Sequence, residues 1–419
     1  MSVYNKLSEE RKKLQAEGLM PEWFSTPGWQ LFKERYLYQA NNPREQYERI
    51  ACTLATHTEE PGVWKDKFFD LLWKGWLSPS TPVLANTGTT RGLPVSCAGS
   101  YIEDSIDAIY KGLHETAALT KAGFGTASYL GDVRPRGSSI SVGGKSSGVL
   151  PIIKSFQQAM DYVAQGTARR GSWAGYVPMD HGDFPEVCED LLHNPDGNNI
   201  GWCVSEEFIE RLKAGDSEAV ERYANAMRTK MVTGKGYFFF PDKANAKRPE
   251  WYVERNLDIK APQLCAEIML HSSEDYTYTC VLSSMNVSKY DEWKDTDAVF
   301  EAIVFLDAVC QEFIERGKNV PGLEKAIAFT KKSRALGLGV CGLHTLFQKK
   351  RIVFGGFESM MLNAEIFRHL EEESIRASKH LASVWGEPEW MKGYGMANTH
   401  RLAVAPTKST ALIMGGISE

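Results

Sequence analysis

Two side chains that could carry out chemistry lie two residues apart in the stretch PQLCAEI, residues 262–268. They are the thiol of Cys265 and the carboxylate of Glu267. On an extended chain, residues two apart project to the same side, so both groups would face one space. A cysteine considered alone is more often a buried structural residue of a strand. Other residues are needed to separate the two interpretations.

Two further cysteines lie in segments with strand-like patterns. A mostly polar stretch after Glu267 leads to TYTCVLSSMNV, which predicts a strand whose Cys280 returns beside the first segment, and LPVSCAGSYIEDS places Cys97 in a third strand. The eight cysteines are scattered without a Cys-x-x-Cys pair, which argues against a zinc knuckle and against a secreted disulfide framework. We therefore expect a reducing cytoplasm and no metal bound by this chain.

Two glycine-rich motifs resemble nucleotide-binding loops but lack the required context. The glycines at 337, 339 and 342 have dinucleotide-binding spacing, which should follow a strand and be followed by an acidic residue roughly 20 positions later. Here KKSRA precedes them, and the acidic residue offered is Glu358, after an irregular FGGF turn. Gly143-Gly144-Lys145-Ser146 resembles a phosphate loop, but Ser139 stands where its first glycine belongs. We set both motifs aside.

The elements that must position these residues fall into a helical N-terminal region, 1–76, and a catalytic region, 77–419. Helical periodicity dominates the first, whereas short apolar stretches alternate with helical patterns in the second, which predicts an α/β barrel or a doubly wound sheet. The predicted strands are Pro82–Asn86, Val95–Tyr101, Gly236–Phe240 and Leu336–Val340. The predicted helices of the second region are Ala108–Lys121, Ile152–Ala164, Glu206–Lys213, Glu218–Met231, Ala298–Glu315 and Ser359–Trp385.

Composition excludes several classes of protein. The 419 residues carry a net charge of -5 and no basic run, so we expect no nucleic-acid partner, because such proteins usually present a basic stripe. The polar start, MSVYNKLSEERKKLQAEGL, has no signal-peptide core, and nothing later approaches a membrane-spanning length. We therefore expect no membrane association.

Seven segments resemble, in order, the large subunits of ribonucleotide reductases. They are LSPSTPVLANTG, PVSCAGSYIEDS, QGTARRGSWAGYVPM, PQLCAEI, TCVLSSMNV, ALGLGVCGL and APTKSTALIMGGISE, within residues 77–419. PEWFSTPGWQLFKERYL also resembles the helical entry of these subunits, particularly of phage versions. The resemblance implies a ten-stranded α/β barrel, made of two five-stranded half-barrels with a central finger loop, after a helical N-terminal region.

The resemblance also implies a role for each cysteine. A ribose 2′-hydroxyl leaves poorly, but removing the neighbouring 3′-hydrogen as an atom makes its loss as water easy. Cys265 would carry the thiyl radical that takes this hydrogen, and Glu267 would accept the 3′-hydroxyl proton. Cys97 and Cys280 would donate two electrons and end as a disulfide, which requires their sulfurs to approach bonding distance. We also expect the Cys265 sulfur to be shielded from bulk solvent.

One residue departs from the family, which usually has Asn two positions before the radical cysteine, where this chain has Gln263. Glutamine keeps the amide donor and acceptor at greater reach, so a contact with a substrate hydroxyl is still expected.

The resemblance further implies two groups of nucleotide-binding residues. Those for the substrate and its diphosphate are Thr81, Ser96, Pro406, Thr407, Lys408, Ser409 and Thr410. We expect Thr407–Thr410 to open a helix, whose free N–H groups bind anions, although plain helix capping is the alternative. The residues for an allosteric effector nucleotide are Asp104, Arg134, Arg169 and Arg170, with solvated surface arginines as the alternative.

By resemblance we expect a class I α subunit, a homodimer that receives its radical from a metal-containing β subunit. Effectors would be deoxynucleotides or ATP, and the reductant a thioredoxin or glutaredoxin. The alternatives are a class II enzyme using adenosylcobalamin and a nucleotide-binding fragment of a split reductase. No ATP cone is recognisable. The last barrel strands, the tyrosine pair that passes the radical inward and the C-terminal cysteine pair are expected beyond Glu419, in a truncated or split form of the family.

Overall fold

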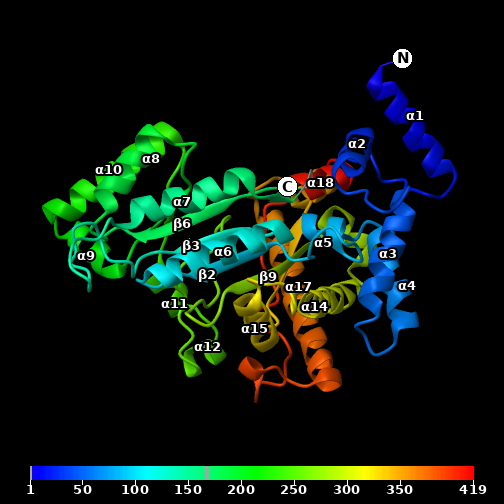
Figure 1. Cartoon of the computed structure of the whole chain (residues 1–419). Coiled ribbons are helices and arrows are strands. Elements are labelled where there is room, and N and C mark those ends of the chain that lie inside the picture. Colours follow the sequence, from blue (N-terminus) through cyan, green and yellow to red (C-terminus); the bar gives the residue numbers. More distant parts are fainter. Residues whose placement is uncertain (1, 166–168) are drawn as a thin grey trace. The chain divides into compact units, whose positions relative to one another are not determined.

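The computed structural model describes residues 2–165 and 169–419, and of residues 164, 165, 169 and 170 the backbone alone. The chain divides into two compact units (Figure 1). Unit one contains Met1–Ser96, Cys280–Lys318 and Thr330–Glu419, and unit two contains Cys97–Thr279 and Asn319–Phe329.

Unit one begins with four helices, which confirms the helical N-terminal region. They are α1 (Val3–Ala16), α2 (Thr26–Arg35), α3 (Pro43–Ala55) and α4 (Pro61–Trp73). The first three helices are capped by Ser2, Ser25 and Asn42. The side-chain oxygen of each accepts the backbone N–H of the residue three positions later. Proline in the first turn of α2, α3 and α4 suits a position that needs no N–H donor.

The strands of unit one are arranged around β9 (Tyr278–Asn286), which enters the unit at Cys280. β1 (Leu77–Pro79) pairs with it antiparallel and β10 (Leu336–Cys341) pairs parallel. The remaining helices of the unit are α5 (Thr81–Asn86), α13 (Tyr290–Trp293), α14 (Ala298–Gly317), α16 (Leu343–Lys350), α17 (Phe357–Trp385) and α18 (Lys408–Ile413). α15 (Glu324–Ser333) begins in unit two and ends in unit one.

One predicted strand of this unit is wrong. Pro82–Asn86 lies in helix α5, with Ser80 before it and Pro82 in the first turn. Val83, Leu84 and Ala85 are all buried, so the apolar run that suggested a strand belongs to a short helix with little exposed surface.

Two of the three glycines that we set aside as a dinucleotide motif, Gly337 and Gly339, lie within the strand itself. A Cβ atom at Gly339 would lie 2.3 Å from the carbonyl oxygen of Ala403, so glycine allows the chain at 401–404 to approach β10 closely. Gly342 then precedes α16 in the left-handed conformation. Close packing, rather than a phosphate loop, explains this pattern.

Unit two is built on five parallel strands in the order β2, β3, β6, β7, β8. Their bounds are Cys97–Tyr101, Gly125–Tyr129, Trp173–Pro178, Ile200–Cys203 and Tyr237–Phe239. The helices are α6 (Ile106–Ala122), α7 (Val149–Tyr162), α8 (Phe184–His193), α9 (Glu206–Lys213), α10 (Ser217–Thr233), α11 (Pro241–Ala246) and α12 (Glu250–Glu254). α6 and α7 run along the strands (Figure 1), and their apolar faces cover a core that includes Phe156, Trp173 and Trp202. The predicted alternation of strands and helices is confirmed.

Candidate active site

The segment that carries Cys265 and Glu267 is a closed loop rather than a strand. The backbone N–H of Gln263 donates to the carbonyl of Ile268 at 3.1 Å, and the N–H of Ile268 donates to the Gln263 side-chain Oε1 at 2.9 Å. Within this closure, Ala266 donates to the Gln263 carbonyl at 3.0 Å and has a φ of 63°. Our expectation of an extended chain was therefore wrong, because a left-handed residue between the two groups breaks the alternation.

The loop leaves its two chemical groups differently exposed. Cys265 is an exposed residue, and Glu267 is half-buried. We expected the Cys265 sulfur to be shielded, and in the described chain it is not.

Gln263 is fully buried and helps to build the loop. Its side-chain oxygen accepts the Ile268 N–H in the loop closure. The Nε2 group is also buried and has no hydrogen-bond partner among residues 2–165 and 169–419. Since a buried amide donor is costly to leave unpaired, Nε2 is the part of Gln263 that could donate to a substrate hydroxyl.

The other two cysteines of the predicted site lie in buried strands of different units. Cys97 begins β2 in unit two and is 4% exposed, and Cys280 lies in β9 of unit one and is 1% exposed. A Cβ atom at Gly337 would lie 3.1 Å from the Cys280 sulfur, so the glycine makes room for this thiol. The pairing of Cys97 with Cys280 stays a prediction.

In unit one, the predicted phosphate-binding segments lie on neighbouring elements. The Thr81 hydroxyl is 3.2 Å from that of Tyr36, and the Ser96 hydroxyl is 2.7 Å from that of Ser80. Thr407 immediately precedes α18, so the predicted helix opening is confirmed. α18 packs against β1 and against α2, which ends beside Tyr36.

The side chains at the start of α18 differ in exposure. Thr407 and Thr410 are buried, and the Thr410 hydroxyl donates to the Thr407 carbonyl at 2.9 Å. Lys408 and Pro406 are exposed, and Ser409 is half-buried. Phosphate binding by these residues stays a prediction.

Unit two contains a cavity of about 730 Å³ that includes two predicted effector residues. Asp104 and Arg134 both line it, and the Arg134 Nε donates to the Asp104 carboxylate at 2.5 Å. The walls are apolar residues of α6 and α7, and the loop between β3 and α7 adds Lys145, Ser146 and Ser147. The side chains of Arg169 and Arg170 lie outside the part of the chain that the structure describes.

Sequence reasoning missed two features of unit two. Lys145 lies in the motif that we set aside as a phosphate loop, and it lines this cavity together with Ser146 and Ser147. Tyr176, in β6, donates its hydroxyl to the Gln263 carbonyl at 3.0 Å. Nothing in the local sequence indicated this contact, since the two residues are 87 positions apart.

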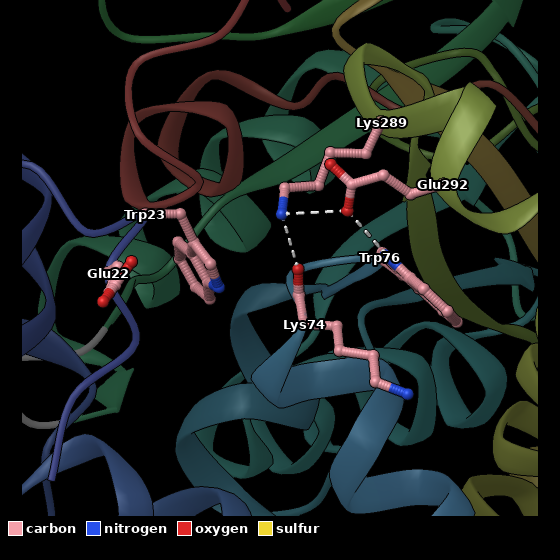
Figure 2. Close-up of a pocket in the computed structure, with 6 residues that line it drawn as sticks. All are labelled: Glu22, Trp23, Lys74, Trp76, Lys289 and Glu292. Atoms are coloured by element: carbon pink, nitrogen blue, oxygen red, sulfur yellow. Dashed lines mark hydrogen bonds and ion pairs between the residues drawn. The ribbon is translucent and has the colours of Figure 1, made fainter. Parts of the chain in front are cut away.

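A separate hollow of about 490 Å³ in unit one contains none of the predicted residues (Figure 2). Trp23 and Trp76 lie on opposite sides of it, and the Trp76 indole N–H donates to Glu292 at 3.2 Å. The Lys289 ammonium is held by the Lys74 carbonyl at 2.9 Å and by Glu292 at 3.4 Å. These hydrogen bonds connect the end of α4 to the residues that follow β9, so the polar side chains of the hollow have a structural role.

In residues 2–165 and 169–419 no three His, Cys, Asp or Glu side chains come together as a metal site would require. In the same residues, each helix is too short or too polar to cross a lipid bilayer.

Comparison with known proteins gives consistent matches. The family model described as the ribonucleotide reductase barrel domain matches residues 95–221 and 216–393, and the model of the all-alpha domain of the same enzymes matches residues 22–92. A putative ribonucleoside-diphosphate reductase large subunit of Frog virus 3 is 32% identical over 374 residues, covering 84% of this chain and 65% of that protein. The chain thus spans just under two thirds of that relative's length.

Relatives of two classes are found. The solved α subunit of the class Id ribonucleotide reductase from Actinobacillus ureae superposes with a TM-score of 0.88 at 40% identity, covering 95% of this chain and 75% of that one. A vitamin B12-dependent ribonucleoside-diphosphate reductase of Thermoplasma acidophilum is 26% identical and matches 88% of this chain and 51% of its own length. The expected fold class, a helical region before a barrel-type α/β fold, agrees with these matches.

Proposed function

Because this chain belongs to the ribonucleotide reductase large-subunit family, we propose that it is catalytic and reduces ribonucleotides to deoxyribonucleotides by thiyl-radical chemistry at Cys265. The observation that carries the proposal is the closed loop from Gln263 to Ile268. It presents a thiol at its tip, a carboxylate two residues later and a buried amide donor at its base.

Each group on the loop has a task in the proposed reaction. The Cys265 thiyl removes the 3′-hydrogen of the ribose as an atom, while Glu267 accepts the 3′-hydroxyl proton. The 2′-oxygen leaves as water after taking a proton from one of the two buried thiols. Cys97 and Cys280 then supply two electrons and the remaining proton and become a disulfide, Glu267 returns its proton to the 3′-oxygen, and Cys265 returns its hydrogen to the 3′-carbon. The Gln263 Nε2 donates to a ribose hydroxyl and orients the sugar.

The phosphates of the substrate are assigned to unit one. The exposed Lys408 provides a positive charge beside the free N–H groups at the start of α18, and Ser409 provides a hydroxyl. Thr81 and Ser96, each within hydrogen-bond distance of another hydroxyl, contribute polar contacts to the same substrate. The substrate proposed is a nucleoside diphosphate, because the similar viral protein is named a ribonucleoside-diphosphate reductase. A nucleoside triphosphate is the alternative substrate.

The cavity of unit two is assigned to an effector nucleotide, a deoxynucleotide or ATP. Its apolar walls suit a base, and Arg134 and Lys145 suit phosphates. Ile106 and Tyr110 on its rim are 71% and 67% exposed, which supports a second copy of the chain covering this face in a homodimer. We place the enzyme in the cytoplasm of a bacterium or of a phage-infected host, with a thioredoxin- or glutaredoxin-type reductant.

The radical is assigned to a separate metal-containing β subunit, as in a class I enzyme, since the 40% identical solved structure is of class Id. Adenosylcobalamin is the second candidate, because vitamin B12-dependent reductases also match this chain. The third is a fragment of a split reductase. Reduction with an added class I β subunit supports the first, reduction with cobalamin alone supports the second, and activity only after adding a complementing chain supports the third.

The role of Cys265 is tested by the substitution Cys265→Ala in whichever of these systems is active. We expect no detectable reduction, since no other group on the loop can form the radical, while effector binding stays as in the wild type. The matched control is Cys52→Ala, which removes an exposed thiol from α3 and should leave the rate unchanged. Full activity of the Cys265 variant would refute the proposal.

A further inference from the structure

The base of the Cys265 loop is tied to the sheet of unit two by one tyrosine. Tyr176 lies in β6 and is fully buried, and its hydroxyl donates to the Gln263 carbonyl at 3.0 Å. The same carbonyl accepts the N–H of Ala266, the residue directly after Cys265. A single oxygen therefore connects the strand, the base of the loop and its tip.

The ring of Tyr176 is held so that its hydroxyl cannot move freely. In the β6–β7 pairing, Tyr176 is in register with Gly201, and a Cβ atom at that glycine would lie 2.1 Å from the tyrosine ring. The ring therefore lies across the backbone of β7, in space that only glycine leaves open. A rigid ring on a central strand is a firm support for a loop without regular structure.

The surroundings of the hydroxyl keep it a hydrogen-bond donor. Burial raises the pKa of Tyr176, and the acidic groups near it, Cys203, Tyr237, Cys265 and Glu267, raise it further. The phenol thus stays protonated at neutral pH. Tyr278 makes a second contact with this segment, to the Ala261 carbonyl, but at 3.4 Å it is longer and lies outside the closed loop.

We propose that Tyr176 is a positioning residue for the reductase reaction, whose hydroxyl fixes the Gln263 carbonyl and thereby the place of Cys265 and Glu267. This inference rests on the proposed function. A residue that only filled the core would need the aromatic ring alone. The positioning role proposed for Tyr176 depends on the hydroxyl, which holds the loop.

The test is Tyr176→Phe, which removes the hydroxyl and keeps the ring. The first readout does not require an active enzyme. It is the rate at which iodoacetamide alkylates Cys265, divided by the rate at Cys52, the other exposed cysteine, and both rates are measured by mass spectrometry. We expect a ratio about 3- to 10-fold higher than in the wild type, as for loss of one hydrogen bond that restrains the loop. The matched control is Tyr47→Phe, a buried tyrosine of α3 in unit one, which should leave the ratio unchanged.

A second readout is the reduction reaction itself. We expect kcat to fall by about tenfold or more with KM within about twofold, because misplacing a reacting group affects the chemical step. An alkylation ratio equal to that of the wild type would overturn the inference. If the wild type proves inactive in every system, the proposed function fails, while the alkylation ratio still decides whether Tyr176 holds the loop.

Folding of the variant is controlled separately. Circular dichroism should show the same helix content in Tyr176→Phe as in the wild type. If the variant does not fold, 3-fluorotyrosine incorporated at position 176 keeps the shape and makes the phenol a stronger donor. The Cys265 alkylation ratio should then fall below that of the wild type, and an unchanged ratio would again overturn the inference.

Discussion

Replacing Glu115 by glutamine should stabilise the protein above neutral pH. Glu115 lies on α6 and is 7% exposed, and its Oε1 has no hydrogen-bond partner among the described residues. Burial raises the pKa of this carboxyl from 4.5 to about 7, and the neighbouring Glu324 adds to the effect. Thr277 and Lys325 act in the opposite direction.

The size and sign of the effect follow from this shift. A difference of about 2.5 pKa units corresponds to roughly 3 kcal/mol, because one unit is about 1.4 kcal/mol. The folded protein holds this proton more tightly than the unfolded chain, so the contribution of Glu115 to stability is fully present below pH 4.5 and is lost as the pH rises to about 7. Above that pH the charged, buried carboxylate remains a constant cost. Glutamine cannot ionise and removes this cost.

The assay is urea unfolding at several pH values between 5 and 8. We expect the free energy of unfolding of Glu115→Gln to exceed that of the wild type by up to about 3 kcal/mol at pH 8 and to be close to it at pH 5. The control is Asp107→Asn, which removes an exposed carboxylate from the same helix. If the difference between Glu115→Gln and the wild type were the same at pH 5 and pH 8, the buried charge would not be the cause and the reasoning would be refuted.

Two further predictions concern the nucleotide sites. Arg134→Gln should weaken binding of the effector nucleotide by about 10- to 100-fold, as for loss of a charged hydrogen bond, in an equilibrium binding assay. Arg136→Gln, which removes an exposed arginine paired with Glu186, is the control, and equal affinities would contradict the assignment of the cavity. Gly337→Ala should slow oxidation of the Cys280 thiol during turnover and lower stability by about 1–3 kcal/mol, because the added carbon would lie 2.5 Å from Leu282 and 3.1 Å from the Cys280 sulfur. Gly62→Ala, in open space on α4, should show neither effect, and a Gly337 variant that behaves in the same way would refute the crowding argument.

Local sequence was a good guide wherever neighbouring residues decide the structure. Helical periodicity predicted α9 at its true ends and located α6, α7, α10, α14 and α17. The buried apolar run at 336–340 was predicted as a strand and is β10. The prediction failed at Pro82–Asn86, where a short buried helix and a buried strand have the same apolar pattern.

In the candidate site too, some features were predicted from the sequence and others were not. The three cysteines, Glu267 and the predicted effector residues were singled out in the sequence because the order of the motifs along the chain resembles the family, and their roles stay predictions. Asp104 and Arg134 do lie together, although 30 positions separate them. The extended geometry assumed for 262–268 was wrong, and so was the shielded Cys265, since both depend on how the loop closes on itself and on what covers it.

By itself, the sequence determined where several long helices and β10 form, which residue types are available for chemistry and which family of proteins the chain belongs to. These properties depend on periodicity, caps and motif order, which act over a few residues or can be compared along the chain. Tertiary structure alone decided that Tyr176 supports the Cys265 loop, that Lys145 lines the cavity and that Glu115 is buried. Contacts between residues far apart, and the loss of water around a charge, arise only when the strands and helices pack together.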